Sequence, residues 1–158
     1  DNPEAQARTE YSVKTLEENG IKVNEVAFQD AKWDTDKAKT AMDTWLQTNQ
    51  DNIDAVIANN DGMAIGAISA LQAVGMNTGS SEDNMVVVGV DATDLAVAEI
   101  DKGTMSGTVK QDAEGMAKAL IVTMKNKLGN GDFIDGTEYK LGADKKSIRI
   151  DYQIYTGK

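Results

Sequence analysis

Two short apolar runs, one at 53–58 that includes Asp54 and one at 85–90, are separated by a segment in which apolar residues recur at helical spacing. Continuous apolar runs of this length are typical of strands covered on both faces, and the spacing between them predicts a helix. Amphipathic segments also precede and follow the two runs, so strands alternate with helices. This alternation predicts an α/β fold in which helices flank a parallel sheet.

The remaining elements are predicted from periodicity and from residues that start or stop helices. Pro3 opens a helix that extends to about residue 18, Asp34 or Thr35 caps a second helix, and Asp61 is expected to cap a third that ends near residue 75. Trp45 falls on the apolar face of the second helix and is expected in the core. The pattern further predicts strands at 21–28, 104–109 and 147–155, and helices at 93–101 and 112–128.

Charge and composition exclude several classes of function. The 158 residues include 26 Asp and Glu against 16 Lys and Arg, which gives a net charge of −10. Nucleic acids and anionic membranes need clustered basic residues, so we expect neither partner. Because Cys and His are both absent from the sequence, thiolate and imidazole metal sites and Ser-His-Asp catalysis are excluded. The remaining chemistry is that of carboxylates, amides, hydroxyls and aromatic rings.

Polar and aromatic residues follow the ends of the expected strands. In open α/β sheets, ligands bind beyond the carboxyl ends of the strands, so these residues are expected on one rim. A helix that begins directly at Pro3 suggests that a strand lies upstream of residue 1. The candidate ligand-binding residues are Asn2, Glu4, Arg8, Trp33, Asn60, Asp91 and Gln111.

This set of side chains suits a sugar. A pyranose presents hydroxyls that both donate and accept hydrogen bonds, and its ring has apolar faces on which an indole stacks. Carboxylates and amides pair with the hydroxyls, and a guanidinium adds a planar fork of donors. Phosphate fits less well, because Asp would repel it and the sequence contains no glycine-rich phosphate loop.

Each candidate also has a purely structural interpretation. Asp61 and Asp91 stand just before helices, where Asp often serves as an N-cap. Trp33 could pack as a hydrophobic staple beside the cap, and Arg8 with Glu4 could form an exposed ion pair. The functional interpretation therefore depends on their convergence in space.

Two enzymatic or signalling alternatives stay open from the residues alone. Glu4 and Asp91 could act as the paired carboxylates of a glycosidase. Asp61 or Asp91 could accept a phosphoryl group as in a receiver domain, with Lys110 as the accompanying lysine.

Five strings in order carry a resemblance to a known family: NPEAQART at 2–9, KWDT at 32–35, VIANNDGMA at 56–64, VGVDA at 88–92 and GTV at 107–109. Together they resemble the galactose/glucose-binding protein family of bacterial ABC sugar uptake and chemotaxis. The resemblance extends over essentially the whole chain. It implies a two-lobed hinged receptor, of which this chain is an incomplete C-terminal lobe with the periplasmic-binding-protein fold.

The resemblance also implies how the chain is divided. Residues 1–110 and 133–158 would form the C-terminal sugar-binding lobe, whose first elements lie upstream. Residues 111–132 would cross to the absent N-terminal lobe and pack there. The apolar stripe of the helix in this segment would then lack its partner.

The sugar contacts of the family correspond in type to Arg8, Trp33, Asn60 and Asp91. At three further positions the sequence departs from the family: Asn2 replaces His, Glu4 replaces Asp and Gln111 replaces Asn. Because a longer side chain displaces a hydroxyl contact or recruits a water, strict preference for glucose or galactose is not implied.

The implied function is binding of a monosaccharide without catalysis, outside the cytoplasm in the periplasm or as a lipoprotein, with an ABC permease and a chemoreceptor as partners. The effector-binding core of a sugar-responsive transcriptional regulator is the alternative within the same fold. The family's calcium loop would lie upstream, with Asp54 as its distant carboxylate. One carboxylate cannot supply the six to eight oxygens that calcium takes, so we expect no cofactor in this chain alone.

Overall fold

The computed structural model describes residues 2–80 and 84–157. The chain forms two compact units, with boundaries between Val109 and Lys110 and between Gln153 and Ile154. Its elements are α1 (Pro3–Glu18), α2 (Thr35–Asn49), the 3-10 turn η1 (Gln50–Asn52), β1 (Ala55–Ile57), α3 (Asp61–Ala73), β2 (Val86–Val90), α4 (Asp94–Asp101), β3 (Gly107–Lys110), α5 (Ala113–Leu128) and β4 (Gln153–Tyr155).

The strands form one sheet in the order β1-β2-β3-β4. β1 pairs parallel with β2, with Ile57 opposite Val88, and β2 pairs parallel with β3, with Val90 opposite Val109. The predicted α/β fold with a parallel sheet flanked by helices is therefore confirmed. Because neighbouring strands run in the same direction, their carboxyl ends lie at the same edge of the sheet.

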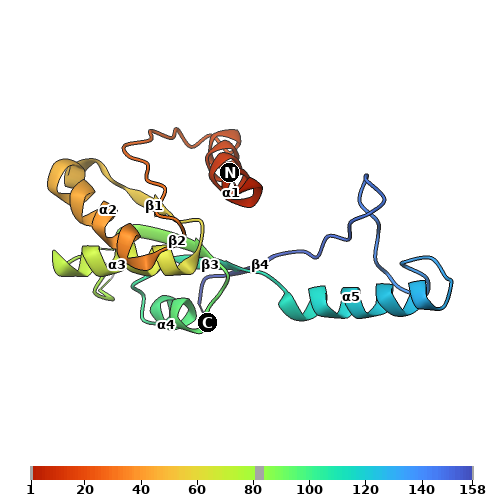
Figure 1. The fold of residues 1–158 in the computed structure, drawn as a ribbon. Coiled ribbons are helices and arrows are strands. Elements are labelled where there is room, and N and C mark those ends of the chain that lie inside the picture. The colour runs from red at the N-terminus through yellow and green to blue at the C-terminus, as the bar shows by residue number, and fades with distance from the viewer. Residues whose placement is uncertain (1, 81–83, 158) are drawn as a thin grey trace. The chain divides into compact units, whose positions relative to one another are not determined.

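The core of the first unit lies between this sheet and its helices. α2 packs on α3, and α3 packs on β1 and β2 (Figure 1). Met42, Ile68, Leu71 and Val87 are almost completely buried there, which shows that the apolar stripes of α2 and α3 meet one face of β2. Trp45 packs against the same cluster, as the helical spacing predicted.

β2 buries only one of its two faces. Val87 is fully buried whereas the adjacent Val86 is 49% exposed. All residues of α1 remain at least partly exposed, so this helix does not bury the second face. The expectation that this apolar run is covered on both faces is therefore wrong for the described chain.

Other differences from the sequence prediction have physical causes. Residues 21–30, all of them described, form no strand, and Ile21 and Phe28 are more than half exposed. A strand requires a hydrogen-bonded neighbour, and β1, the edge strand of the sheet, pairs only with β2 among the described residues. The strand predicted at 147–155 is confined to β4. The cap of α3 is Asn60 rather than Asp61, and the cap of α4 is Thr93 rather than Asp91.

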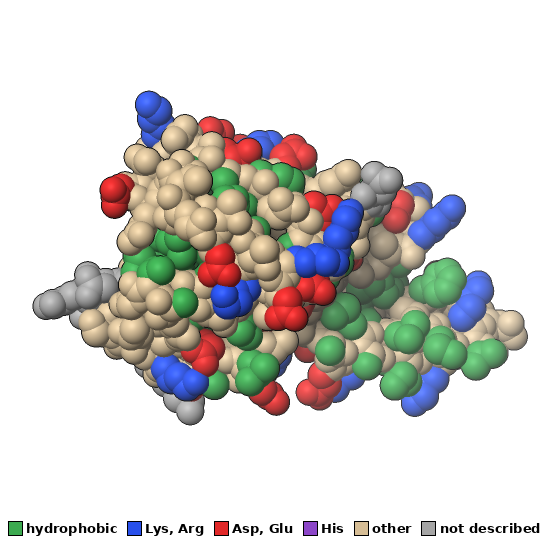
Figure 2. Space-filling view, turned by 60° about the vertical axis from the view of Figure 1, so that its left-hand side comes forward, with side chains coloured by type: hydrophobic (Ala, Val, Ile, Leu, Met, Phe, Trp, Pro, Cys, Tyr) green, Lys and Arg blue, Asp and Glu red, His purple; other side chains and the backbone are tan. Residues whose placement is uncertain are grey.

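α5 in the second unit exposes most of its apolar side chains. The exposed fractions of Leu120, Met124 and Leu128 are 61, 55 and 82%. Hydrophobic side chains gather on this part of the surface (Figure 2). Its bounds match the predicted helix, because Asp112 caps it by accepting from the Gly115 N–H at 2.9 Å.

Candidate functional site

Arg8 and Trp33 meet beside the sheet. The Arg8 guanidinium carbon lies 5.9 Å from the centroid of the Trp33 ring, within cation–π range. Arg8 comes from α1 and is largely buried, with its side chain 15% exposed, whereas Trp33 is 40% exposed. The structure therefore brings together two of the predicted site residues and leaves part of the indole accessible.

Asn59, just beyond the end of β1, fixes α1 and Arg8 in place. Its backbone oxygen accepts from Arg8 Nη1 at 2.7 Å. Its side-chain Nδ2 donates to Thr9 Oγ1 at 2.9 Å and to the Ala5 backbone oxygen at 3.3 Å. The sequence placed Asn59 among the polar residues that follow the strand, but it did not predict these contacts with α1, which depend on the fold.

The loop that carries Trp33 has an unusual backbone. Lys32 and Trp33 have φ values of 56° and 61°, which non-glycine residues rarely adopt. Asp30 supports the turn by accepting from the Lys32 N–H at 3.0 Å and from Lys32 Nζ at 2.6 Å. These hydrogen bonds, with the side-chain bond to Lys32 the largest cause, hold the pKa of Asp30 below its ordinary value. The turn leads directly into α2, whose cap is the predicted Asp34.

Asn2 and Glu4 lie at the beginning of α1. Asn2 Oδ1 accepts from the N–H groups of Glu4 at 2.9 Å and Ala5 at 3.2 Å, so this side chain caps the helix. Glu4 is exposed, and its Oε2 lies 3.9 Å from Arg8 Nη2. The structure thus places Glu4 and Arg8 together and assigns Asn2 a capping role besides the predicted one.

Asn60 and Asp91 occupy matching positions on neighbouring strands. Each stands three residues beyond the paired Ile57 and Val88, so both lie where the carboxyl ends of β1 and β2 meet. Asn60 Oδ1 caps α3 by accepting from the Met63 N–H at 2.9 Å. The amide Nδ2 of Asn60 is the donor that remains suited to a ligand hydroxyl.

Asp61 has neither of the roles suggested for it by the sequence. Its side chain is fully buried, and the cap of α3 is Asn60. Asp61 Oδ1 accepts from Thr108 Oγ1 at 2.6 Å. A buried carboxylate does not present itself to a phosphoryl donor, so the geometry disfavours a receiver-like reaction at this residue.

Gln111 and Asp54 are the remaining residues that the sequence singled out. Gln111 belongs to the second unit, where its Oε1 accepts from Tyr152 Oη at 3.4 Å. Asp54 is exposed just before β1, and the described residues contain no group of three or more acidic residues suited to a metal ion. A lone exposed carboxylate does not fit calcium by itself.

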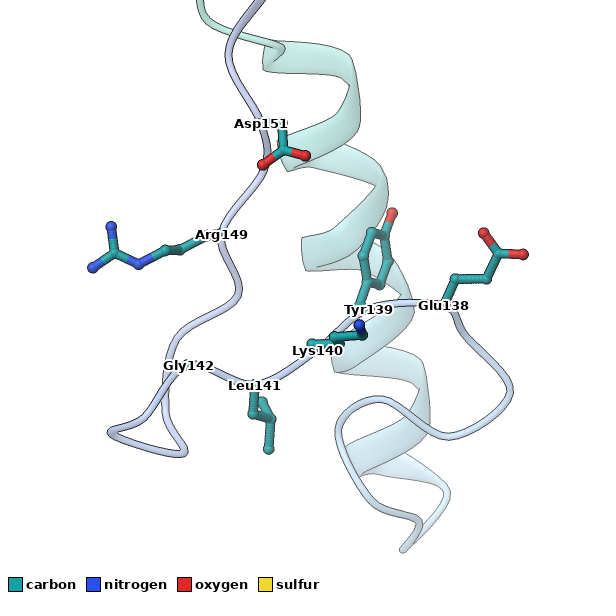
Figure 3. Close-up of a pocket in the computed structure, with 7 residues that line it drawn as sticks. All are labelled: Glu138, Tyr139, Lys140, Leu141, Gly142, Arg149 and Asp151. Carbon is teal, nitrogen blue, oxygen red and sulfur yellow. The ribbon is translucent and has the colours of Figure 1, made fainter. Parts of the chain in front are cut away.

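A surface depression in the second unit has a volume of about 370 Å³ and none of the predicted site residues lines it. The side chains of Glu138 and Arg149 point away from one another there (Figure 3). Charged groups that diverge do not define a site for a small polar ligand, so the rim remains the candidate site.

Residues 1–132 match the periplasmic binding protein domain family. The chain belongs to this family. Among the residues that the structure describes, no helix is long and apolar enough to cross a membrane. The family accounts for the parallel sheet with polar residues at its carboxyl edge, which is where α/β proteins bind ligands.

Two relatives of this periplasmic binding protein domain are named for the sugars that they bind. The D-galactose/methyl-galactoside binding periplasmic protein of Haemophilus influenzae is 35% identical over 96% of this chain and 43% of its own length. The ribose import binding protein of Bacillus subtilis is 37% identical over 61% of this chain and 29% of its own length. The chain thus spans less than half of either relative.

Solved structures agree in fold. A solute-binding protein from Actinobacillus succinogenes with bound D-allose has a TM-score of 0.74 and 26% identity, covering 96% of this chain and 46% of that one. Another from Bacillus halodurans with bound myo-inositol has a TM-score of 0.67 and 35% identity, covering 94% of this chain and 45% of that one. These names describe binding in transport and not a reaction, and they give the regulator alternative no support.

Proposed function

We propose that the chain is the C-terminal lobe of a receptor that binds a monosaccharide for uptake by an ABC permease. The contact between Arg8 and Trp33 beside the carboxyl end of β1 carries the proposal. It combines a partly accessible indole with a guanidinium that is already held in place. Relatives named for galactose and ribose, and a solved structure with bound allose, support the same class of ligand.

Each side chain of the rim has a defined task in this proposal. The indole of Trp33 stacks on one apolar face of the sugar, and Arg8 donates to ring substituents. Asn60 donates through Nδ2, and the Asp91 carboxylate accepts from two hydroxyls. Asn2, Glu4 and Gln111 complete the set and tune the choice of sugar. The longer Glu4 and Gln111 favour a hexose or a related polyol over strict selection of glucose or galactose.

The receptor works by closure and without covalent chemistry. The sugar is held between two lobes, and hinge closure presents a surface to the permease and to a chemoreceptor. This role places the protein outside the cytoplasm, in the periplasm or anchored to the outer face of the membrane as a lipoprotein.

The division between lobes follows from the same proposal. Residues 1–110 and 133–158 belong to the C-terminal lobe, and residues 111–132 pack on the N-terminal lobe. The exposed apolar side chains of α5 support this assignment, because such a stripe is ordinarily covered. Calcium, if the whole receptor binds it, takes Asp54 as one ligand and needs oxygens from another segment.

The test is a fluorescence titration of Trp33 with glucose, galactose, allose, ribose and myo-inositol. We titrate the chain alone and the chain mixed with the N-terminal lobe of its receptor, using Trp45→Phe to remove the second indole. A saturable change in the mixture that Trp33→Ala abolishes is the expected result. Half a cleft loses several kcal/mol of binding free energy, so the chain alone should bind more weakly than millimolar. No response in either sample would overturn the proposal.

A further inference from the structure

The turn between β2 and α4 holds two consecutive non-glycine residues at positive φ, 122° at Asp91 and 51° at Ala92. L-residues avoid this region because Cβ is crowded there, and such conformations persist only where surrounding contacts impose them. The turn carries the Asp91 carboxylate. Whatever imposes its conformation therefore decides where that carboxylate points.

Hydrogen bonds to β3 impose the conformation from one side. The Asp91 N–H donates to the Val109 backbone oxygen at 2.9 Å, which extends the pairing of β2 with β3 by one residue. The next N–H, that of Ala92, donates to the hydroxyl oxygen of Thr108 at 3.2 Å. The hydrogen-bond acceptor on β3 thus changes from a backbone oxygen to a side-chain hydroxyl at the point where the chain turns.

Asp61 accepts hydrogen bonds both from the segment that follows the turn and from β3. Its Oδ2 accepts from the Thr93 N–H at 2.7 Å, and its Oδ1 accepts from Thr108 Oγ1 at 2.6 Å. The Thr108 hydroxyl therefore donates to Asp61 and accepts from the turn. Gly89 makes room for this carboxylate, because a Cβ on Gly89 would lie 2.6 Å from Asp61 Oδ1.

The geometry points to Asp61 and Thr108 as positioning residues of the sugar site, which fix the turn at Asp91 and Ala92 and so direct the Asp91 carboxylate toward the ligand. This inference rests on the proposed function for its ligand. The conformation of the turn can nevertheless be tested without any sugar.

A purely helical role does not account for the arrangement. A carboxylate in the first turn of α3 already interacts favourably with the helix dipole when it is exposed to water, so this role does not require burial. Burying an ionised carboxylate costs free energy that only specific partners offset. The partners of Asp61 are the turn and β3, so its burial serves the connection between these elements.

The first test uses Thr108→Val, which keeps the branched shape and removes the hydroxyl. NMR measures the three-bond HN–Hα couplings of Asp91 and Ala92 and the amide exchange rate of Ala92. We expect changed couplings and exchange that is about tenfold faster, whereas Thr108→Ser stays close to wild type. Thr44→Val is the matched control, because Thr44 is exposed and its hydroxyl donates to the Thr40 backbone oxygen within α2.

A result identical to wild type at Asp91 and Ala92 in Thr108→Val would overturn the inference. If Thr108→Val fails to fold, Asp61→Asn takes its place. Asparagine has one side-chain oxygen in place of two, so it cannot accept from both the Thr93 N–H and Thr108 Oγ1. Faster exchange of the Thr93 or the Ala92 amide is therefore expected, and unchanged exchange of both contradicts the inference.

Sugar affinity separates this inference from the proposed function. In the chain mixed with its N-terminal lobe, Thr108→Val should lower the affinity for the sugar that binds wild type by about tenfold. Thr108→Ser should bind that sugar about as tightly as wild type. Equal binding by wild type and Thr108→Val overturns the positioning role alone. If wild type binds no sugar while the turn responds to Thr108→Val, the proposed function fails and the structural coupling stands.

Discussion

The guanidinium of Arg8 lies 5.9 Å from the ring of Trp33 and donates a hydrogen bond to the backbone oxygen of Asn59. An arginine with one donor already committed retains other N–H groups for a ligand. The Glu4 carboxylate, 3.9 Å from Arg8 Nη2, supplies an acceptor next to them. A sugar placed on the indole would therefore meet donors that are held in place before it arrives, with the exposed Glu4 carboxylate beside them.

Arg8→Lys should lower the sugar affinity of the reconstituted receptor by about 1–2 kcal/mol. A lysine ammonium cannot donate to Asn59 and also present a planar fork beside Trp33. Fluorescence titration measures the change. Arg149→Lys is the matched control, since Arg149 is exposed in the second unit. An affinity that drops equally in both variants would contradict a specific role for Arg8.

Asn60→Asp should separate capping from binding. Aspartate keeps the oxygen that accepts from the Met63 N–H, so the stability of α3 should change by less than about 0.5 kcal/mol. It loses the Nδ2 donor, so sugar affinity should fall. Urea denaturation and titration measure the two effects. Asn60→Ala is expected to lose both, with a stability cost of about 1 kcal/mol.

Helices were predicted well from the sequence because their starts depend on neighbouring residues. Asp34, one of the two predicted caps, caps α2, and the helix predicted at 112–128 begins directly after its cap Asp112. The strand predicted at 21–28 is absent from these described residues because pairing depends on a distant neighbour. Local pattern alone therefore predicts helices more securely than strands.

The candidate site was also predicted only in part from the sequence. Its position beyond the carboxyl ends of the strands followed from the βα alternation, and the contact of Arg8 with Trp33 agrees with it. The hydrogen bonds of Asn59 with α1 and the positive φ at Asp91 depend on contacts between elements far apart in sequence. Glycine is the usual signal for positive φ, and an aspartate there gave no such signal.

Glu99 gives the first unit an acid-sensitive contact. Its carboxylate, 20% exposed, accepts from Lys102 Nζ and from Thr104 Oγ1, each at 2.6 Å. These bonds, that to Lys102 first, hold the pKa of Glu99 below its ordinary value of 4.5. The contribution to stability is therefore complete above pH 4.5 and is lost as the pH falls through the lower pKa of the folded state.

Glu99→Gln should accordingly be less stable than wild type near neutral pH, by about 1 kcal/mol. The difference should narrow as the pH falls below 4.5, the ordinary pKa of the carboxyl. Urea denaturation across this range measures it. A difference that stays constant with pH would show that protonation of Glu99 is not involved.

Gly66→Ala should strongly destabilise the first unit. In an exposed helix this change is stabilising by about 1 kcal/mol. Here the new Cβ would overlap the Thr35 backbone oxygen and lie 3.1 Å from the Lys39 nitrogen, where α2 crosses α3. Backbone atoms cannot move aside as a flexible side chain does, so we expect a loss of about 2–3 kcal/mol. Gly129→Ala is the control, because its Cβ would meet nothing closer than 3.5 Å. Thermal unfolding followed by circular dichroism compares the two.

The exposed apolar stripe of α5 should make the isolated chain associate as its concentration rises. Leu120 and Met124 are each more than half exposed, and apolar side chains gathered on one helix face attract other apolar surfaces. Leu120→Lys combined with Met124→Lys should reduce this association in sedimentation velocity experiments. Thr44→Lys with Gln47→Lys adds the same charge to exposed positions of α2 and controls for electrostatic repulsion. If both double variants reduce association equally, net charge rather than the α5 stripe governs it, and the assignment of α5 to the N-terminal lobe loses its support.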